Sequence, residues 1–397
     1  MRLTKIHATL GPASSDLDTI RKMMGAGMDA CRLNMSHCSH ELGRQIVRNV
    51  RSAASERNQP MAIGADLKGP KLRIGDVVGG SVSLEPGAAV RLTSEQRLSD
   101  PATIWVDYDH LATDVRPGDP ILMNDGFIAL RVEEVAGREV LCRVVMGGRL
   151  SSRKGVNLPG IPLRVPSLTE KDLEDLAFAL EARLDFLYVS YARSADHIRE
   201  VRAAARRLGR ELPIVAKIER QEGVEHLSEI IQEADGICVA RGDLGIEMTI
   251  GAVPWVQVEA SRLCHHAGKF VMNGGQLLAS MASTPLPLRA EVSDLATVVR
   301  DGLDAIVLSD ETAAGDYPVE AVRMASHVLE IAEQHVATVE PDGAASKPAF
   351  TNVDNPDRSN WLSAWRNRRL SDDPTRQPGG RASWRAAPSP GGGSSSE

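Results

Sequence analysis

Eight short apolar segments, separated by helical segments, restrict the fold of this chain more than any other feature. Each is rich in aliphatic residues, as in "TKIHATLG" near the N-terminus, and most turn polar at the C-terminal end. We predict strands at residues 4–11, 29–36, 61–67, 186–192, 214–219, 236–244, 270–276 and 305–311. Repeated strand–helix units favour parallel strands, and eight of them close a barrel whose chemistry lies at the C-terminal rim. The predicted fold class is therefore α/β, a TIM (β/α)8 barrel.

A doubly wound open sheet is the structural alternative to this barrel. Dinucleotide-binding sheets of that type carry a Gly-x-Gly-x-x-Gly turn before a helix. No such turn opens any of the predicted helices, so we favour the barrel.

The alternation of strands and helices stops between residues 70 and 165. Short strands separated by Pro-Gly, Asn-Asp-Gly and Gly-Gly corners predict an all-β insert there, after the third strand. The end of the chain is rich in Pro, Gly, Ser and Arg without a sustained period, which predicts disorder. The expected domains are the barrel (1–69 and 166–337), the insert (70–165) and a low-complexity tail (338–397).

Composition excludes several kinds of partner. The net charge is −7, so neither nucleic acid nor an anionic membrane surface is expected. No apolar run is long enough to span a membrane, and the N-terminus lacks a signal-peptide pattern. The 5 cysteines are odd in number and form no Cys-x-x-Cys pair, which fits reduced thiols. We predict a cytoplasmic protein.

Cations and carboxylates gather at the predicted strand ends. Because the C-terminal ends of barrel strands meet at one rim, these side chains are expected to converge. They are Arg32, Asn34, Ser36, His37, Asp66, Lys68, Lys71, Arg73, Lys217, Glu219, Arg241, Asp243, Ser309, Asp310 and Glu311. Any one of them alone is more simply explained as a solvated strand end, but the whole set is not.

The chemistry of this set predicts a type of reaction. Glu219 and Asp243 follow adjacent strands and together can hold Mg²⁺, which takes one or two protein carboxylates and keeps positions for substrate oxygens. Nearby cations such as Arg32, Lys217 and Lys154 suit phosphates and carboxylates. Phosphoryl transfer needs positioning, a metal ion and cations where charge develops. The residues alone predict a metal-dependent enzyme that handles phosphates.

At these residues the sequence resembles the pyruvate kinase family. The blocks "TKIHATLGPAS", "DLKGPKLRIG", "RKGVNLPG", "VAKIERQEGVEHLSEII" and "ADGICVARGDLGIEM" match signature blocks of the family in the same order. The matching blocks span residues 4–326. The resemblance implies a TIM barrel interrupted after strand 3 by a β-barrel lid domain. It also implies glycolytic phosphoryl transfer from phosphoenolpyruvate to ADP, giving pyruvate and ATP.

The resemblance assigns roles by matching position. The implied catalytic residues are Lys217 and Arg32. The implied substrate contacts are Arg32, Lys217, Gly242, Asp243 and Gly275. The implied nucleotide contacts are Asn34, Ser36, His37, Arg73 and Lys154. The implied Mg²⁺ (or Mn²⁺) ligands are Glu219 and Asp243, and the implied monovalent-cation group is Asn34, Ser36, Asp66, Leu67 and Lys71.

Four departures from the family pattern bear on activity. Lys71 replaces a glutamate that goes with a K⁺ requirement, and its ammonium supplies the charge of a bound K⁺, so we expect K⁺ independence. Gly275 replaces a threonine tied to proton transfer, a loss of about 10²–10⁴ in rate if that hydroxyl is a general acid. Asp310 adds a negative charge near the phosphates. The family's C-terminal effector domain has no counterpart, which leaves the barrel faces for a homo-oligomer.

Three functions stay open at this point. The first is an active pyruvate kinase that depends on Mg²⁺ and not on K⁺. The second is a catalytically impaired paralogue that binds substrate or nucleotide. The third is a metal-dependent lyase or aldolase acting on substrates of the phosphoenolpyruvate or pyruvate type. We favour the first, because the insert and the intact "RKGVNLPG" make sense chiefly if a nucleotide must be covered.

Overall fold

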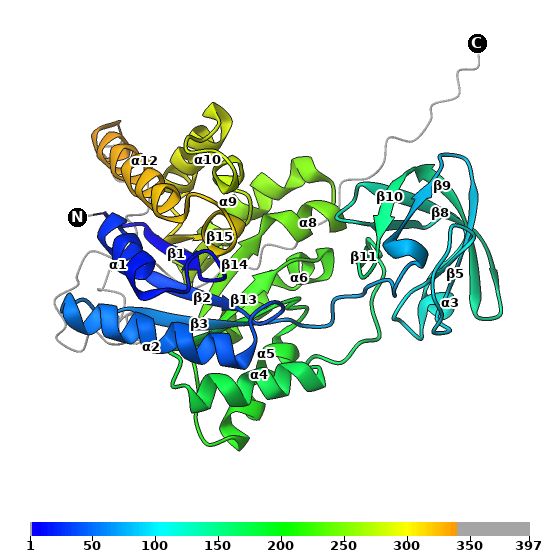
Figure 1. Ribbon diagram of the computed structural model, residues 1–397, viewed down its shortest axis with the longest axis horizontal. Helices are drawn as coiled ribbons and strands as arrows, with labels where there is room; N and C mark the ends of the chain where they lie inside the picture. Colours follow the sequence, from blue (N-terminus) through cyan, green and yellow to red (C-terminus); the bar gives the residue numbers. More distant parts are fainter. Residues whose placement is uncertain (1, 340–397) are drawn as a thin grey trace, which may run out of the picture. The chain divides into compact units, whose positions relative to one another are not determined.

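The computed structural model describes residues 2–339, and its central feature is a closed barrel of eight parallel strands (Figure 1). In barrel order the strands are β1 (Lys5–Thr9), β16 (Ala305–Leu308), β15 (Phe270–Gly274), β14 (Gly236–Ala240), β13 (Ile214–Ile218), β12 (Phe186–Val189), β3 (Ala62–Leu67) and β2 (Ala30–Asn34). The first and last strands pair in register, Lys5 with Ala305. This pairing confirms the predicted TIM barrel and makes the doubly wound alternative wrong.

Helices surround the barrel (Figure 1). They are α1 (Leu17–Ala26), α2 (His40–Glu56), α4 (Glu170–Glu181), α5 (Ala195–Arg207), α6 (Gln221–Glu225), α7 (Leu227–Glu233), α8 (Arg241–Glu247), α9 (Val253–His266), α10 (Arg289–Arg300), α11 (Asp310–Ala313) and α12 (Pro318–Val339), with η2 (Ile250–Ala252) and η3 (Ala279–Ala282). Their apolar faces pack on the strands, as Ile20 and Met23 of α1 do, and both are fully buried. Among the helices of residues 2–339, none has the length and hydropathy needed to cross a membrane.

Four aspartates, each one residue before a strand, fasten neighbouring strands at the N-terminal end of the barrel. Each carboxylate accepts a hydrogen bond from a main-chain N–H of the adjacent strand at 2.7–2.9 Å. In return, each aspartate N–H donates to the carbonyl of that same residue. The pairs are Asp29 with Ile6, Asp185 with Ile63, Asp235 with Ile214, and Asp304 with Val271. These contacts satisfy strand-end donors that would otherwise be buried without a partner.

The β insert follows β3 and has a hydrophobic core of its own, which includes Leu92, Ile104, Ile121 and Cys142. Its six-stranded sheet contains β11 (Val156–Asn157), β7 (Pro120–Met123), β8 (Ile128–Ala136), β9 (Glu139–Met146), β5 (Ala89–Thr93) and β6 (Thr103–Trp105). The remaining elements are η1 (Val78–Gly80), α3 (Leu111–Asp114) and the paired strands β4 (Ser81–Leu84) and β10 (Gly148–Ser151).

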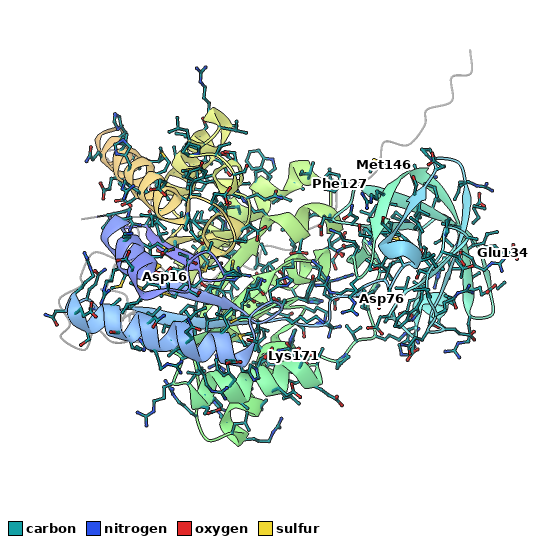
Figure 2. All side chains as sticks on the ribbon, in the orientation of Figure 1. Asp16, Asp76, Phe127, Glu134, Met146 and Lys171 are labelled. Atoms are coloured by element: carbon teal, nitrogen blue, oxygen red, sulfur yellow. The ribbon has the colours of Figure 1, made fainter. Side chains whose placement is uncertain are left out.

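The apolar surface of the insert lies beside the β8–β9 pairing. Phe127, just before β8, is 73% exposed, and Met146 at the end of β9 is 47% exposed. Both side chains are labelled in Figure 2. Met146 pairs with Ala129 near the start of β8, so the two apolar side chains lie at the same end of the β8–β9 pair.

The observed strand β14 is shorter than the predicted strand. The strand expected at 236–244 ends at Ala240, because Arg241 already begins α8. Apolar-to-polar patterning does not distinguish a strand followed by a loop from a strand followed at once by a helix. The predicted disorder of the tail falls almost wholly outside the described residues, apart from the last turn of α12.

His7 of β1 is enclosed within the barrel. It is fully buried, its Nδ1 lies 2.5 Å from the Tyr188 hydroxyl, and the ring of Phe270 stacks on it. Burial lowers the pKa of His7 from 6.5 to about 3. Between these two pH values the unfolded chain binds a proton that the folded chain does not, so acid favours unfolding in this window.

We expect His7→Gln to make folding less sensitive to acid. Between about pH 7.5 and about pH 5, the wild type should lose about 2 kcal/mol of unfolding free energy through His7, and the variant should not lose that part. Urea unfolding at the two pH values measures the difference. Replacing the exposed His335 with Gln is the control. Equal acid losses in wild type and His7→Gln would contradict this account.

Candidate active site

Asp66, at the C-terminal end of β3, is the centre of a buried ionic network. Its Oδ2 accepts from Arg32 Nε at 2.6 Å and lies 3.2 Å from Lys217 Nζ. Arg32 also donates to the hydroxyl of Thr9 at 2.8 Å. Burial would raise the pKa of Asp66, but the charges of Lys217 and Arg32 lower it below its ordinary value. Asp66 is therefore an ionised group that fixes two cations at the rim.

Lys217 connects this network to Glu219. Its Nζ lies 2.9 Å from Glu219 Oε1 and donates to Ser190 Oγ, also at 2.9 Å. Burial would lower the pKa of Lys217, but the carboxylates of Asp66 and Glu219 raise it above its ordinary value. Ser190 in turn donates to Asp66 Oδ1 at 3.1 Å. The ammonium of Lys217 is charged and held in place by three oxygens.

Tyr191 joins the two carboxylates that the sequence marks as metal ligands. Its main-chain N–H donates to Glu219 Oε2 at 2.6 Å, and its hydroxyl lies 3.4 Å from Asp243 Oδ1. The backbone of Tyr191 has φ +54°, a left-handed conformation that is unfavourable for a bulky residue. Asp243 Oδ1 also accepts from Lys71 Nζ at 2.8 Å. Backbone strain at Tyr191 therefore accompanies contact with both carboxylates.

Glu219 and Asp243 fit a divalent cation. Burial raises the pKa of Glu219, Lys217 opposes that shift, and the neighbouring charge of Asp243 adds to it. A cation between the two carboxylates would relieve this repulsion. In residues 2–339 no group of three or more His, Cys, Asp or Glu side chains is placed to hold a metal ion. A pair of carboxylates suits Mg²⁺, which takes its remaining ligands from water and substrate.

The structure places the residues with predicted nucleotide roles in two regions. Asn34 ends β2, and its Oδ1 accepts from the main-chain N–H of Ser36 at 3.2 Å, with the exposed His37 next in sequence. Asn34 also pairs in register with Asp66, which joins this turn to the ionic network. Arg73 and Lys154 lie instead at the base of the insert, where Arg73 Nη1 donates to the Arg153 carbonyl at 3.0 Å. The barrel network contains neither of these last two side chains.

Lys71 has a different ion-pair partner from Asp66, the other charged member of the predicted monovalent-cation group. Its ammonium contacts Asp243, whereas Leu67 is buried at the end of β3 and Asp66 contacts Arg32 and Lys217. The fixed charge of Lys71 is therefore beside a proposed metal ligand.

Gly242 and Gly275 leave the rim open. A Cβ at Gly242 would meet nothing within 4 Å, and one at Gly275 would meet only the Gly242 main-chain nitrogen at 3.6 Å. Gly275 has φ +96°, where a β-branched residue is strained. A threonine at position 275 would thus have room but not a favourable backbone. The neighbouring Asn273 is fully buried and donates to Gln257 on α9.

Glu311 and Asp310, both predicted at the rim, differ in exposure. Glu311 is buried, and its carboxylate accepts from the main-chain N–H groups of Leu278 and Ser309, so it fastens the chain around α11. Asp310 is exposed. Ser190 and Tyr191 were missed by sequence reasoning, although both directly follow β12 and obey the same strand-end pattern.

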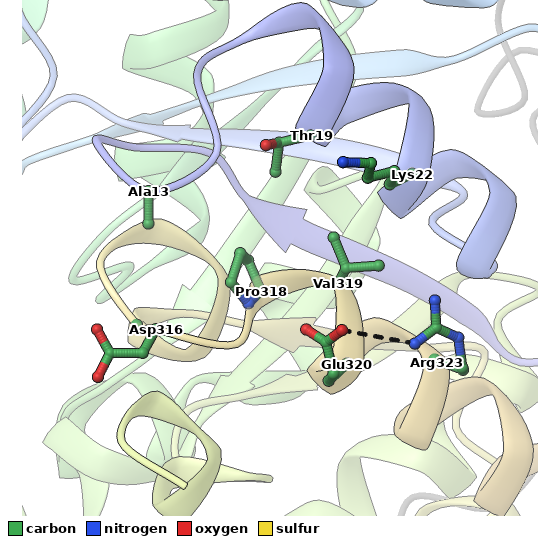
Figure 3. Close-up of a pocket in the computed structure, with 9 residues that line it drawn as sticks. Ala13, Thr19, Lys22, Asp316, Pro318, Val319, Glu320 and Arg323 are labelled. Carbon is green, nitrogen blue, oxygen red and sulfur yellow. Dashed lines mark ion pairs between the residues drawn. The ribbon is translucent and has the colours of Figure 1, made fainter. Parts of the chain in front are cut away.

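A separate pocket of about 730 Å³ lies between α1 and the start of α12 (Figure 3). Its lining includes Ala13, Thr19, Lys22 and Arg323. Both basic side chains have acidic partners, Lys22 with Asp18 and Arg323 with Glu320. None of the residues that line this pocket belongs to the ionic network, so we do not assign the chemistry to it.

The fold and the site together define a (β/α)8-barrel protein with a β insert and an acidic pair beside two buried cations at the C-terminal rim. The family model described as pyruvate kinase, barrel domain, matches residues 1–322. The chain therefore belongs to the pyruvate kinase family.

Curated relatives agree with this assignment. The chain is 40% identical over 357 residues to pyruvate kinase 2 of Synechocystis sp., which covers 89% of this chain and 60% of that protein. It is 38% identical to a pyruvate kinase of Clostridium perfringens (85% of this chain, 71% of that one). It is 40% identical to a pyruvate kinase of Bacillus licheniformis (84% and 58%). The chain thus spans about three fifths of the length of two of these relatives.

We expect Glu219→Gln and Asp243→Asn each to weaken Mn²⁺ binding by at least about tenfold, because each removes one charged ligand of the pair. Electron paramagnetic resonance of free Mn²⁺, titrated with the full chain, measures the affinity. Asp310→Asn is the matched control, since it removes an exposed rim carboxylate. A loss of affinity in the control equal to that in the other two variants would count against the assignment.

Proposed function

We propose that this chain transfers the phosphoryl group of phosphoenolpyruvate to ADP, giving pyruvate and ATP, as a glycolytic enzyme of the cytoplasm. The observation that carries the proposal is the ionic cluster in which Asp66 pairs with Arg32 and Lys217, and Lys217 also contacts Glu219. The charge of Asp243 acts on Glu219 in the same cluster. Arg32 lies on β2, Lys217 lies on β13 with Glu219 directly after it, and Asp243 lies in α8, which follows β14. The C-terminal ends of the strands are where barrel enzymes place their chemistry. The relatives named pyruvate kinase support the same reaction.

Arg32 and Lys217 are proposed to act on the phosphoryl group. Asp66 holds the guanidinium of Arg32 on one side, which leaves Arg32 poised to bind substrate phosphate oxygens. Lys217 offers an ammonium that neutralises charge as the phosphoryl group leaves the enolate oxygen for the nucleotide. Gly242, with open space around it, allows the substrate carboxylate to approach the main chain.

Glu219 and Asp243 are proposed to hold Mg²⁺ or Mn²⁺. When bound, the cation supplies positive charge to the phosphate and enolate oxygens. Asn34, Ser36 and His37 on the barrel, together with residues of the insert, are proposed to contact the nucleotide. We also propose that the insert (70–165) acts as a lid domain on the barrel (1–69 and 166–337).

K⁺ independence is proposed to rest on Lys71. Its ammonium, 2.8 Å from Asp243, places a fixed positive charge beside the metal pair. The resemblance groups Lys71 with Asn34, Ser36 and Asp66, where a bound K⁺ would be expected. In this proposal a positive charge near the phosphates replaces that of K⁺, whichever group anchors it.

A catalytically impaired enzyme is the second candidate, and the open space at Gly275 favours it. No side chain there can donate a proton to the enolate carbon after phosphoryl transfer. A water molecule could take that role, since an added Cβ at Gly275 would meet only the Gly242 main-chain nitrogen within 4 Å. Measured turnover of the wild type distinguishes the two candidates.

We expect wild-type protein with Mg²⁺ to form pyruvate from phosphoenolpyruvate and ADP without K⁺.

Lys217→Met should lower kcat by at least about 10²-fold, because it removes the cation at the transferring group. The exposed Lys22→Met is its matched control.

Lys71→Glu should make turnover depend on K⁺.

The possible outcomes separate the three functions left open by the sequence. Absent turnover with retained Mn²⁺ and nucleotide binding would establish the impaired paralogue. Metal-dependent cleavage of a keto acid, without use of ADP, would establish the lyase or aldolase. Turnover in Lys217→Met equal to that of the wild type would overturn the role of Lys217.

A further inference from the structure

The segment that returns from the insert to the barrel, residues 158–165, is unusual in its main-chain hydrogen bonding. Pro159 and Pro162 within it, and Pro166 directly after it, have no N–H. One turn, closed by the Ile161 N–H on the Leu158 carbonyl, is its main-chain hydrogen bond within the segment. The segment forms no strand, so no sheet satisfies its carbonyls. We call it the return linker. Its carbonyls need donors from elsewhere.

Arg193 provides two of these donors. It follows β12, and its Nη1 and Nη2 donate to the carbonyls of Leu163 and Val165 at 2.9 and 3.0 Å. The two nitrogens of one guanidinium therefore hold alternate carbonyls of the return linker. This geometry uses the rigid fork of arginine, which a lysine cannot reproduce.

Arg220 provides donors for two further carbonyls of the return linker, both from one nitrogen. It is 6% exposed, and its Nη2 donates to the carbonyls of Leu158 and Ile161 at 3.3 and 2.9 Å. Its Nη1 lies 3.2 Å from Oε1 of Glu247, which is itself buried. The same Oε1 accepts from Asn157 Nδ2 at 2.7 Å, at the last position of the insert sheet. Barrel and insert thus share one buried carboxylate.

We propose that Arg193 and Arg220 form a clamp that fixes the return linker to the barrel, and that Arg220 is a positioning residue for nucleotide binding. Arg220 directly follows Glu219, so one loop holds both a proposed metal ligand and the insert. Lys154, a proposed nucleotide contact, lies a few residues before the linker. The clamp sets the place where the linker after Lys154 joins the barrel. This second part rests on the function proposed above.

Hydrogen–deuterium exchange of the full chain tests the clamp without substrate. In Arg220→Met the amides of residues 158–165 should exchange roughly tenfold faster, since charge-assisted bonds to two carbonyls are lost. The amides of β14 should keep their exchange rates. The exposed Arg262→Met, which breaks an ion pair with Glu259 on one helix, is the matched control and should change nothing in the linker.

Two further variants separate the clamp from simple charge balance. Arg220→Lys keeps a cation for Glu247, but its single nitrogen cannot serve Glu247 and both carbonyls at once, as Nη1 and Nη2 of Arg220 do, so the linker should still exchange faster. The double variant Arg220→Met with Glu247→Gln removes both buried charges, which keeps the test valid if the single variant fails to fold. The clamp is overturned if the linker amides of Arg220→Lys exchange as slowly as those of the wild type. It is also overturned if linker exchange is unchanged both in Arg220→Met and in the double variant.

Steady-state kinetics test the positioning role. In Arg220→Met the KM for ADP should rise by roughly 3- to 10-fold, while the KM for phosphoenolpyruvate should stay within roughly twofold, because the loosened element carries nucleotide contacts. Equal rises in both KM values, or none, overturn that role. If the wild type shows no turnover, the proposed function fails, and Kd values for ADP and phosphoenolpyruvate decide the positioning role in the same way. The exchange result decides the clamp.

Discussion

The charge of Asp66 is the interaction on which the rim of this barrel depends. Arg32 and Lys217 are both largely buried, and two cations there without a counter-charge would be strongly unfavourable. Asp66 pairs with both of them. β12 lies between the strands of Asp66 and Lys217, and Ser190 at its end bridges the two with one hydroxyl. Barrel order therefore decides which charges meet.

The charges of the rim are nearly balanced before any ligand enters. Three carboxylates, Asp66, Glu219 and Asp243, meet three cations, Arg32, Lys217 and Lys71. A divalent cation and a phosphate that enter together add little net charge to be buried. This balance explains how one cluster can suit both a metal ion and an anionic substrate. The return linker attaches the insert next to this cluster, since Arg220 directly follows Glu219.

Much of this architecture could be predicted because it is written in local patterns. The position of each strand followed from a short apolar run, and errors were confined to strand ends, as at Ala240. Charged site residues were found because they follow strands. Ser190 and Tyr191 follow a strand equally closely but were passed over, because the strand predicted at residues 186–192 included them, whereas β12 ends at Val189. Aspartates such as Asp235 can be seen in the sequence directly before their strands. Their hydrogen-bond partners lie on a neighbouring strand, so the role of these aspartates cannot be inferred from local sequence.

The sequence by itself determined the eight strand–helix units, the all-β insert and the charged residues at the rim, because periodicity and side-chain chemistry are local properties. Only the tertiary structure decided how those residues pair. It placed Lys71 on Asp243, used Glu311 as a buried fastener of main-chain N–H groups, and brought Arg220 to the return linker. These pairings join residues far apart in the chain or on opposite sides of a turn. Barrel closure and the path of the linker set them.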